Sequence, residues 1–288
     1  MAVILFTTTD VRGPRRLDFE RLLASVRQAD NLEIRHYVLL QNATEADRMH
    51  WRAAAPACCR IDAVPGRMSI SAARNRMMAD AVAEATPQDG DVVGFPDDDC
   101  WFADGFLQCL ADLFDENARL GVLVCRVSLD PDPNGFDAGS VTPLAAHQAV
   151  RLATSNNMFF RGALTAAIGR FDPELGLGTA SGGGEDTDYV IRAYLRAREA
   201  GLIDRPLVGH PVPDRISAAR YFRGALIVLA YHARSSPALT LECFRKIFVG
   251  LYFTASGKMS LAGYRQALAD GARAFGAKRD LAPARGTA

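Results

Sequence analysis

Short apolar runs alternate with amphipathic stretches along the first 130 residues of the chain. The runs that lack helical periodicity predict buried strands. They are VILFTT (3–8), IRHYVLLQN (34–42), CRIDAVP (59–65), DVVGF (91–95) and LGVLVCRVSL (120–129). The stretches between them predict helices over 17–29, 44–55, 69–85 and 102–117. Alternation of this kind predicts an α/β fold with a Rossmann-like, mainly parallel sheet flanked by helices.

The pattern changes after residue 130. A loop rich in Pro, Gly and Asp (130–143) precedes a strand-like piece in NNMFFRGAL. Residues 181–201 then read as a glycine-rich loop that runs into a helix. Residues 215–276 are helical in pattern and mix aromatic with basic side chains. We therefore expect an α/β domain over 1–215 and a helical C-terminal extension over 216–288.

Composition narrows the classes of protein. Of 288 residues, 49% are hydrophobic, and 33 Lys and Arg balance 33 Asp and Glu, which argues against a nucleic-acid partner. The six cysteines form no CxxC pair, so reduced core residues are expected. MAVILFTTTD lacks the basic start of a signal peptide, and GALIVLAY (224–231) is too short to span a bilayer. We expect a soluble, cytoplasmic protein.

Three consecutive aspartates follow the strand DVVGF. In an extended segment Asp97 and Asp99 point the same way, while Asp98 faces away. Mg²⁺ is commonly shared between one or two carboxylates and the phosphates of a substrate, and it would relieve the repulsion between the acids. A solvated acidic turn is the competing interpretation, and the triplet alone does not decide between the two.

A second acidic group opens the predicted helix that follows the glycines 182–184. Glu185 and Asp186 suit the positive end of the helix dipole, which is the purely structural explanation. The glycines also permit close approach to a ligand or a mobile hinge. In that case Asp186 or Glu185 is a candidate general base that activates a hydroxyl nucleophile.

Three further positions have both a structural and a chemical interpretation. Arg74, near the start of its helix, is suited to phosphate contacts, although an exposed arginine lying over a helix is commoner. Asn157 belongs to the SNN turn (155–157) and could instead hydrogen-bond a ligand. His210, between Gly and Pro, is either a metal ligand or an inert loop histidine.

The order of these motifs is more informative than any one of them. TTTD, SISAARNRMM, VVGFPDDDCWF, SNNMFFRGAL, IGRFDPELGLG and GGGEDTDYVIRAYLRA follow one another over roughly residues 1–215. In this order they resemble the family 2 glycosyltransferases of the GT-A fold, in which the acidic triplet supplies the DXD motif. The resemblance implies an inverting, metal-dependent hexosyltransferase-like enzyme that uses a UDP-, GDP- or dTDP-linked sugar.

The resemblance also implies roles for the acidic residues. Asp97 would contact the nucleotide ribose, Asp99 would bind the Mg²⁺ or Mn²⁺ that bridges the diphosphate, and Asp98 would support the loop or touch the sugar. Asp186 would be the catalytic base, with Glu185 beside it. Nucleotide-sugar binding would occupy about residues 1–130, and the acceptor side with the base about 130–215.

Further donor contacts follow from the same resemblance. Arg74 would lie against the nucleotide, Thr7 and Thr8 would line the base pocket, and Asn157 would bind the donor. His210 would be a further metal or diphosphate ligand. Members often carry an Asp just after the second strand, whereas here Asn42 or its neighbour Gln41 would take its place, which leaves the nucleotide base open.

The partners are less defined by the sequence. The acceptor would be a carbohydrate or a lipid-linked hydroxyl compound in bacterial polysaccharide or glycoconjugate assembly. The basic and aromatic C-terminal helices would pack on the catalytic domain or a second subunit, or contact the inner membrane peripherally, and the oligomeric state stays open. The alternatives are a non-catalytic carbohydrate-binding or scaffold protein on the same fold and a sugar-nucleotide pyrophosphorylase. TTTDVRGPRR has only one of the several glycines that the last class would carry.

Overall fold

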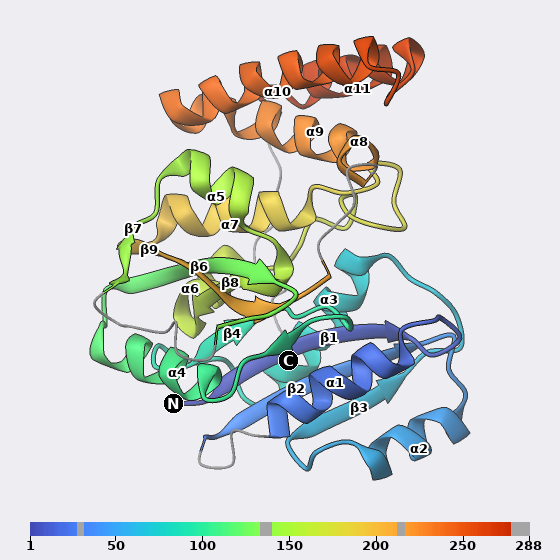
Figure 1. Cartoon of the computed structure of the whole chain (residues 1–288), viewed down its shortest axis with the longest axis vertical. Helices are drawn as coiled ribbons and strands as arrows, with labels where there is room; N and C mark the ends of the chain where they lie inside the picture. The colour runs from blue at the N-terminus through green and yellow to red at the C-terminus, as the bar shows by residue number, and fades with distance from the viewer. Residues whose placement is uncertain (28–31, 133–139, 212–216, 278–288) are drawn as a thin grey trace.

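One sheet forms the centre of the molecule (Figure 1). The computed structural model describes residues 1–27, 32–132, 140–211 and 217–277, and within these ranges the sheet has nine strands. Across the sheet the order is β3 (Cys59–Ala63), β2 (Ile34–Gln41), β1 (Val3–Asp10), β4 (Val92–Gly94), β8 (Met158–Arg161), β6 (Leu120–Ser128), β9 (Glu199–Gly209) and β5 (Trp101–Phe102), with β7 (Thr142–Pro143) paired to β9.

The predicted α/β fold is confirmed, and the sheet is parallel from β3 to β4. Beyond β4 it is mixed, because β8 runs antiparallel to both β4 and β6, whereas β6 and β9 are parallel. Gly94 pairs with Phe159, so the start of β8 lies beside the end of β4. The turn that precedes β8 is thereby brought to the edge of the sheet where β4 ends.

Helices cover both faces of the sheet. They are α1 (Arg16–Arg27), α2 (Glu45–Ala54), α3 (Ile70–Glu84), α4 (Phe106–Glu116), α5 (Ala146–Leu152), α6 (Gly162–Ile168), α7 (Glu185–Arg196), α8 (Ser217–Arg220), α9 (Phe222–His232), α10 (Pro237–Ala255) and α11 (Leu261–Ala274). Alternate side chains of β1 face opposite ways. Leu5 packs in the cluster that holds Phe19 of α1, and Phe6 in the one that holds Met77 of α3.

Local sequence signals explain where two helices begin. Thr44 caps α2 through a reciprocal capping box with Asp47, as its position predicts. Two serines lie at the start of α3. Ser69 is the N-cap and accepts a hydrogen bond from the backbone of Ala72, whereas Ser71 is buried and donates to Leu175 O at 2.7 Å.

The C-terminal helices form a separate layer at one end of the long axis (Figure 1). α9 packs on α7 through a small cluster that includes Leu175, Ile191 and Leu229, and α10 and α11 lie outside α9. None of the described helices combines the length and the apolar content that crossing a bilayer requires. The tail 278–288 and residues 133–139 of the loop 130–143 lie outside the described residues.

Candidate active site

The acidic triplet lies directly beyond β4, at the carboxyl end of a central strand. Two side chains from other parts of the chain hold the backbone of this loop by hydrogen bonds. Pro96 O accepts a hydrogen bond from Thr7 Oγ1 at 2.9 Å, and Asp97 N donates to Asn156 Oδ1 at 2.7 Å. In open α/β sheets ligands bind outside the carboxyl ends of the strands, so the triplet occupies the expected position for a site.

Each aspartate of the triplet contacts the side chain of an arginine. Arg74 donates to Asp97 at 3.1 Å, and Arg15 contacts Asp98 at 2.9 Å and Asp99 at 3.0 Å. Asp98 and Asp99 are only 7% and 5% exposed. The interpretation of the triplet as a solvated turn is therefore wrong, since two of its carboxylates are buried and Asp97, whose side chain is 34% exposed, is bound by Arg74.

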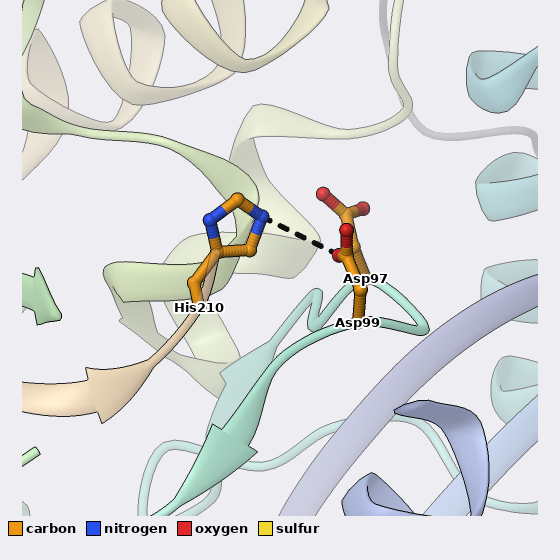
Figure 2. A group of neighbouring side chains, drawn as sticks. All are labelled: Asp97, Asp99 and His210. Atoms are coloured by element: carbon orange, nitrogen blue, oxygen red, sulfur yellow. Dashed lines mark ion pairs between the residues drawn. The ribbon is translucent and has the colours of Figure 1, made fainter. Parts of the chain in front are cut away.

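Asp97, Asp99 and His210 form a group that could hold a metal ion. One carboxylate oxygen from each aspartate and an imidazole nitrogen all lie within 4.8 Å of one another (Figure 2). Asp99 Oδ1 is buried with no hydrogen-bond partner among the described residues, and His210 Nε2 lies 3.3 Å from it. Two carboxylates and an imidazole suit Mn²⁺, and carboxylate oxygens suit Mg²⁺. The residues present therefore fit a divalent cation.

The protonation of His210 bears on this site. Burial lowers the pKa of His210, but the Asp99 carboxylate, 3.3 Å from Nε2, outweighs that effect and raises it. A protonated imidazole cannot ligate a metal, so a cation and a proton would compete for the same nitrogen.

The second acidic group meets the first through Arg74 and Ser155. Arg74 Nη1 donates to Asp186 Oδ1 at 2.7 Å while Nη2 donates to Asp97 Oδ1. Ser155 repeats this bridge, since its backbone N–H donates to Asp186 Oδ2 and its hydroxyl to Asp97 Oδ2, both at 3.0 Å. The fold thus brings Asp97 and Asp186 to the two sides of one arginine and one serine.

Glu185 begins α7 after a tight backbone turn. Gly184 has φ 97°, a conformation that favours glycine. Burial raises the pKa of Glu185 to about 7, the charge of Asp186 adds to this, and Arg74 opposes it. Burial also raises the pKa of Asp97. The site therefore carries one carboxyl group, that of Glu185, that exchanges protons near neutral pH, as general acids and bases require.

Two of the predicted base-pocket residues lie at the ends of β1 and β2. Gln41 Nε2 donates to Thr8 Oγ1 at 2.8 Å, and Asn42, with φ 53°, donates from Nδ2 to Asp10 Oδ2 at 2.8 Å. Thr7 does not join them, because it has no exposed surface and its hydroxyl contacts Pro96 O and His36 Nε2. Its expected place in a pocket lining is incorrect, and Thr7 instead supports the acidic loop.

Asn157 is likewise part of the scaffold and does not face a ligand. It is 2% exposed, its amide nitrogen donates to Cys125 O and Leu152 O, and its oxygen accepts from Thr154 N. The residues of the same turn that reach the site are Ser155 and Asn156, which both donate to Asp97. Of the SNN turn, Ser155 and Asn156 therefore reach the site and Asn157 does not.

Arg15 is the site residue that sequence reasoning missed. It follows β1 in the loop VRGPRR, where three arginines are within five residues. Nothing local distinguishes the one that folds back over Asp98 and Asp99.

Comparison with known proteins gives matches in structure. No protein-family model and no curated protein matches the chain. Among solved structures, S. aureus TarS 1-349 is 17% identical, with a TM-score of 0.63 over 96% of this chain and 81% of that one. The same protein in complex with UDP-GlcNAc gives a TM-score of 0.64 at 17% identity over 96% of this chain and 82% of that one.

A second protein gives the same result. The mannosyltransferase PcManGT from Pyrobaculum calidifontis, in complex with GDP-Man and Mn²⁺, is 16% identical, with a TM-score of 0.61 over 94% of this chain and 73% of that one. Identities this low establish the fold alone, and membership of family 2 stays a prediction. The chain has the GT-A fold of these glycosyltransferases.

Proposed function

We propose that this protein is an inverting glycosyltransferase that moves a sugar from a nucleotide-diphosphate sugar to a hydroxyl acceptor, in bacterial polysaccharide or glycoconjugate assembly. The observation that carries the proposal is the pairing of a metal-competent group with a second carboxylate, Asp186, across the single side chain of Arg74. The fold supports it, since proteins with this fold are solved with UDP-GlcNAc and with GDP-Man and Mn²⁺.

The metal group would act on the leaving group. Asp97, Asp99 and His210 would hold Mg²⁺ or Mn²⁺, which would supply positive charge to the departing diphosphate. Arg15, half-exposed beside Asp98 and Asp99, would be positioned to contact the same phosphates. The residues at the ends of β1 and β2, Thr8 and Asn42, would face the nucleotide base.

Asp186 would act on the acceptor. Both of its oxygens are oriented by hydrogen bonds from Arg74 and Ser155. In the reaction the acceptor oxygen forms a bond to the anomeric carbon, the bond from that carbon to the diphosphate oxygen breaks, and the acceptor proton passes to Asp186. A single displacement of this kind inverts the anomeric centre. Glu185, with its pKa near 7, would share the proton with its neighbour.

The two competing functions lack comparable support. A scaffold protein has no need for a buried arginine that holds two acidic groups together, since replacing a buried ion pair with apolar side chains is often neutral or stabilising. A pyrophosphorylase would require a glycine- and arginine-rich loop after β1, and VRGPRR holds a single glycine.

The test is release of nucleotide diphosphate from a panel of UDP-, GDP- and dTDP-sugars with Mn²⁺ and simple acceptors. We expect release with one nucleotide class and its loss, by about 10²-fold or more, in Asp99→Ala and Asp186→Asn. Asp204→Asn is the matched control, because Asp204 is an exposed aspartate of β9 paired only with Arg126. Product anomers read by NMR would test inversion.

Turnover without the natural acceptor is slow for many transferases, so binding is measured in parallel. Titration calorimetry with each nucleotide diphosphate should show affinity that needs Mn²⁺ in the wild type and that Asp99→Ala removes. If no nucleotide diphosphate binds in a metal-dependent way, the scaffold function becomes the better account.

A further inference from the structure

The C-terminal helical layer has an excess of positively charged residues. Residues 217–277 contain eight Lys or Arg and only two acidic residues, in a chain whose net charge is zero. Glu242 is paired with Arg151 and Arg245, and Asp270 with Arg223 and Arg273; both acids are buried. No acidic side chain of this layer is therefore exposed within the described residues.

An apolar ridge runs along the outer face of α10. Leu241, Phe244, Phe248, Leu251 and Tyr252 form it, and each exposes 48–68% of its surface. Their spacing of three, four, three and one residues places them on one side of a helix. Leu239, Glu242 and Gly250, on the other side of α10, are buried.

The size of this ridge matches the largest apolar patch on a typical soluble monomer, about 300–600 Å², which is often functional. Large side chains have areas of about 150–250 Å², so five that are roughly half exposed form a contiguous patch of roughly 500 Å². Patches above about 400 Å² mark interaction sites in soluble proteins. Figure 1 shows α10 on the outermost layer of the molecule, with no described element beyond it.

Cations flank the ridge. Between residues 243 and 269 the chain has four Lys or Arg and no Asp or Glu. Lys258, exposed just beyond the end of α10, places its ammonium group 5.5 Å from the ring centre of Tyr252 on the ridge. Lys246 lies on the inner side of α10 instead, with its ammonium group 5.4 Å from the ring centre of the buried Phe222.

We propose that the outer face of α10 docks on the surface of an anionic lipid bilayer. A helix with aromatic and aliphatic side chains on one face and basic side chains beside them lies in the interface between headgroups and acyl chains. Each Lys or Arg near an anionic surface adds to the attraction. A second copy of this chain fits less well, because a two-fold contact through the ridge would bring the same basic flanks together.

This surface deepens the proposed function in one respect. If the protein is a glycosyltransferase, docking through α10 would present its site to acceptors anchored in the membrane. Docking itself does not depend on that function.

Vesicle co-sedimentation tests the proposal. We expect the wild type to bind vesicles of phosphatidylcholine with 30% phosphatidylglycerol at least tenfold more tightly than phosphatidylcholine alone, and more weakly in 0.5 M salt. Phe244→Glu combined with Phe248→Glu should reduce binding at least tenfold. The matched control, Leu17→Glu with Met49→Glu, adds the same charge at exposed positions of α1 and α2, in the half of the molecule away from α10, and should bind as the wild type does.

Three results would overturn the proposal: equal binding to both vesicle types, equal binding by the ridge variant and its control, or a concentration-dependent dimer that the ridge variant abolishes in light scattering. Metal-dependent binding of nucleotide diphosphate, measured on the same proteins, separates this proposal from the function. We expect that binding to be unchanged in the ridge variant, which also shows that the variant is folded.

Discussion

Arg74 can be tested without knowledge of the substrate, because its replacement should destabilise the protein in a pH-dependent way. Its side chain is 3% exposed and lies between Asp97 and Asp186, with its guanidinium carbon 5.1 Å from the ring centre of Phe171. Arg74→Met keeps the aliphatic stem and removes the charge. Breaking a buried ion pair by removing one partner costs about 3–5 kcal/mol, out of a total stability of about 5–15 kcal/mol.

The pH dependence follows from the acids left behind. Burial raises the pKa of Glu185 from 4.5 to about 7, and Arg74 opposes this rise for both Glu185 and Asp97. A carboxyl group whose folded pKa is raised stabilises the fold fully below its unfolded pKa and loses that contribution as pH rises through the folded value. Without Arg74 both pKa values rise further, so the variant should lose more stability at pH 7.5 than at pH 5.

The assay is urea unfolding at both pH values. We expect a deficit of about 3–5 kcal/mol at pH 7.5 that is smaller by about 1–2 kcal/mol at pH 5, since one unit of pKa shift corresponds to about 1.4 kcal/mol. Arg161→Met is the matched control, because Arg161 is also buried but donates only to backbone carbonyls, such as Leu120 O and Phe114 O.

The control should lose stability by the same amount at both pH values. A deficit below about 1 kcal/mol for Arg74→Met at pH 7.5, well short of the cost of breaking a buried pair, would refute the reasoning. So would a deficit that does not change with pH. If the variant is too unstable to purify, Arg74→Lys keeps the charge and loses the two-pronged contact, and should show a smaller deficit with little pH dependence.

Three other outcomes are expected. Mn²⁺ at a hundred times its dissociation constant should stabilise the wild type by about 2.7 kcal/mol in thermal unfolding, and Asp99→Asn should abolish this effect. Gly224→Ala should cost about 1–3 kcal/mol, because the new Cβ would lie 1.9 Å from Gly183 O, whereas Gly271→Ala, with its nearest contact at 3.4 Å, should be neutral or stabilising in the same denaturation assay. Asp188→Asn should cost about 3–5 kcal/mol of stability at pH 7 and less at low pH. Burial raises the pKa of Asp188, but His232 and Arg192 outweigh burial and lower it, so the stabilising charge is lost only at low pH. Melting temperatures measured across pH would show this.

Most elements of the fold could be predicted because their signals are local. Apolar runs, amphipathic spacing and the caps at Thr44 and Ser69 lie within a few residues of the elements they define. The direction of β8 was not predictable in this way, because it depends on how a turn about sixty residues after β4 folds back against it. The sheet is consequently mixed where the sequence predicts mainly parallel pairing.

The candidate site likewise combines residues whose placement follows from local sequence with residues whose placement depends on distant contacts. Thr7 and Thr8 are consecutive on one strand, so their side chains face opposite ways, and only one of them could face a pocket. The period of a strand was sufficient to reveal this. The contacts of Arg15 with Asp98 and of Ser155 with Asp186 were beyond local reasoning, because each joins residues far apart in the chain.

Charge explains why these distant residues converge. Five carboxyl groups meet in the described part of the site (Asp97, Asp98, Asp99, Glu185 and Asp186), and the cationic or ionisable partners that the chain supplies are Arg15, Arg74 and His210. The acids exceed the bases. Burial is the main reason why the pKa values of Asp97 and Glu185 are raised even beside an arginine, and the neighbouring carboxylates add to this rise. A divalent cation among Asp97, Asp99 and His210 would offset this excess and lower the pKa of both carboxyl groups. Metal binding would therefore favour the ionised form of the carboxyl groups that the proposed displacement uses.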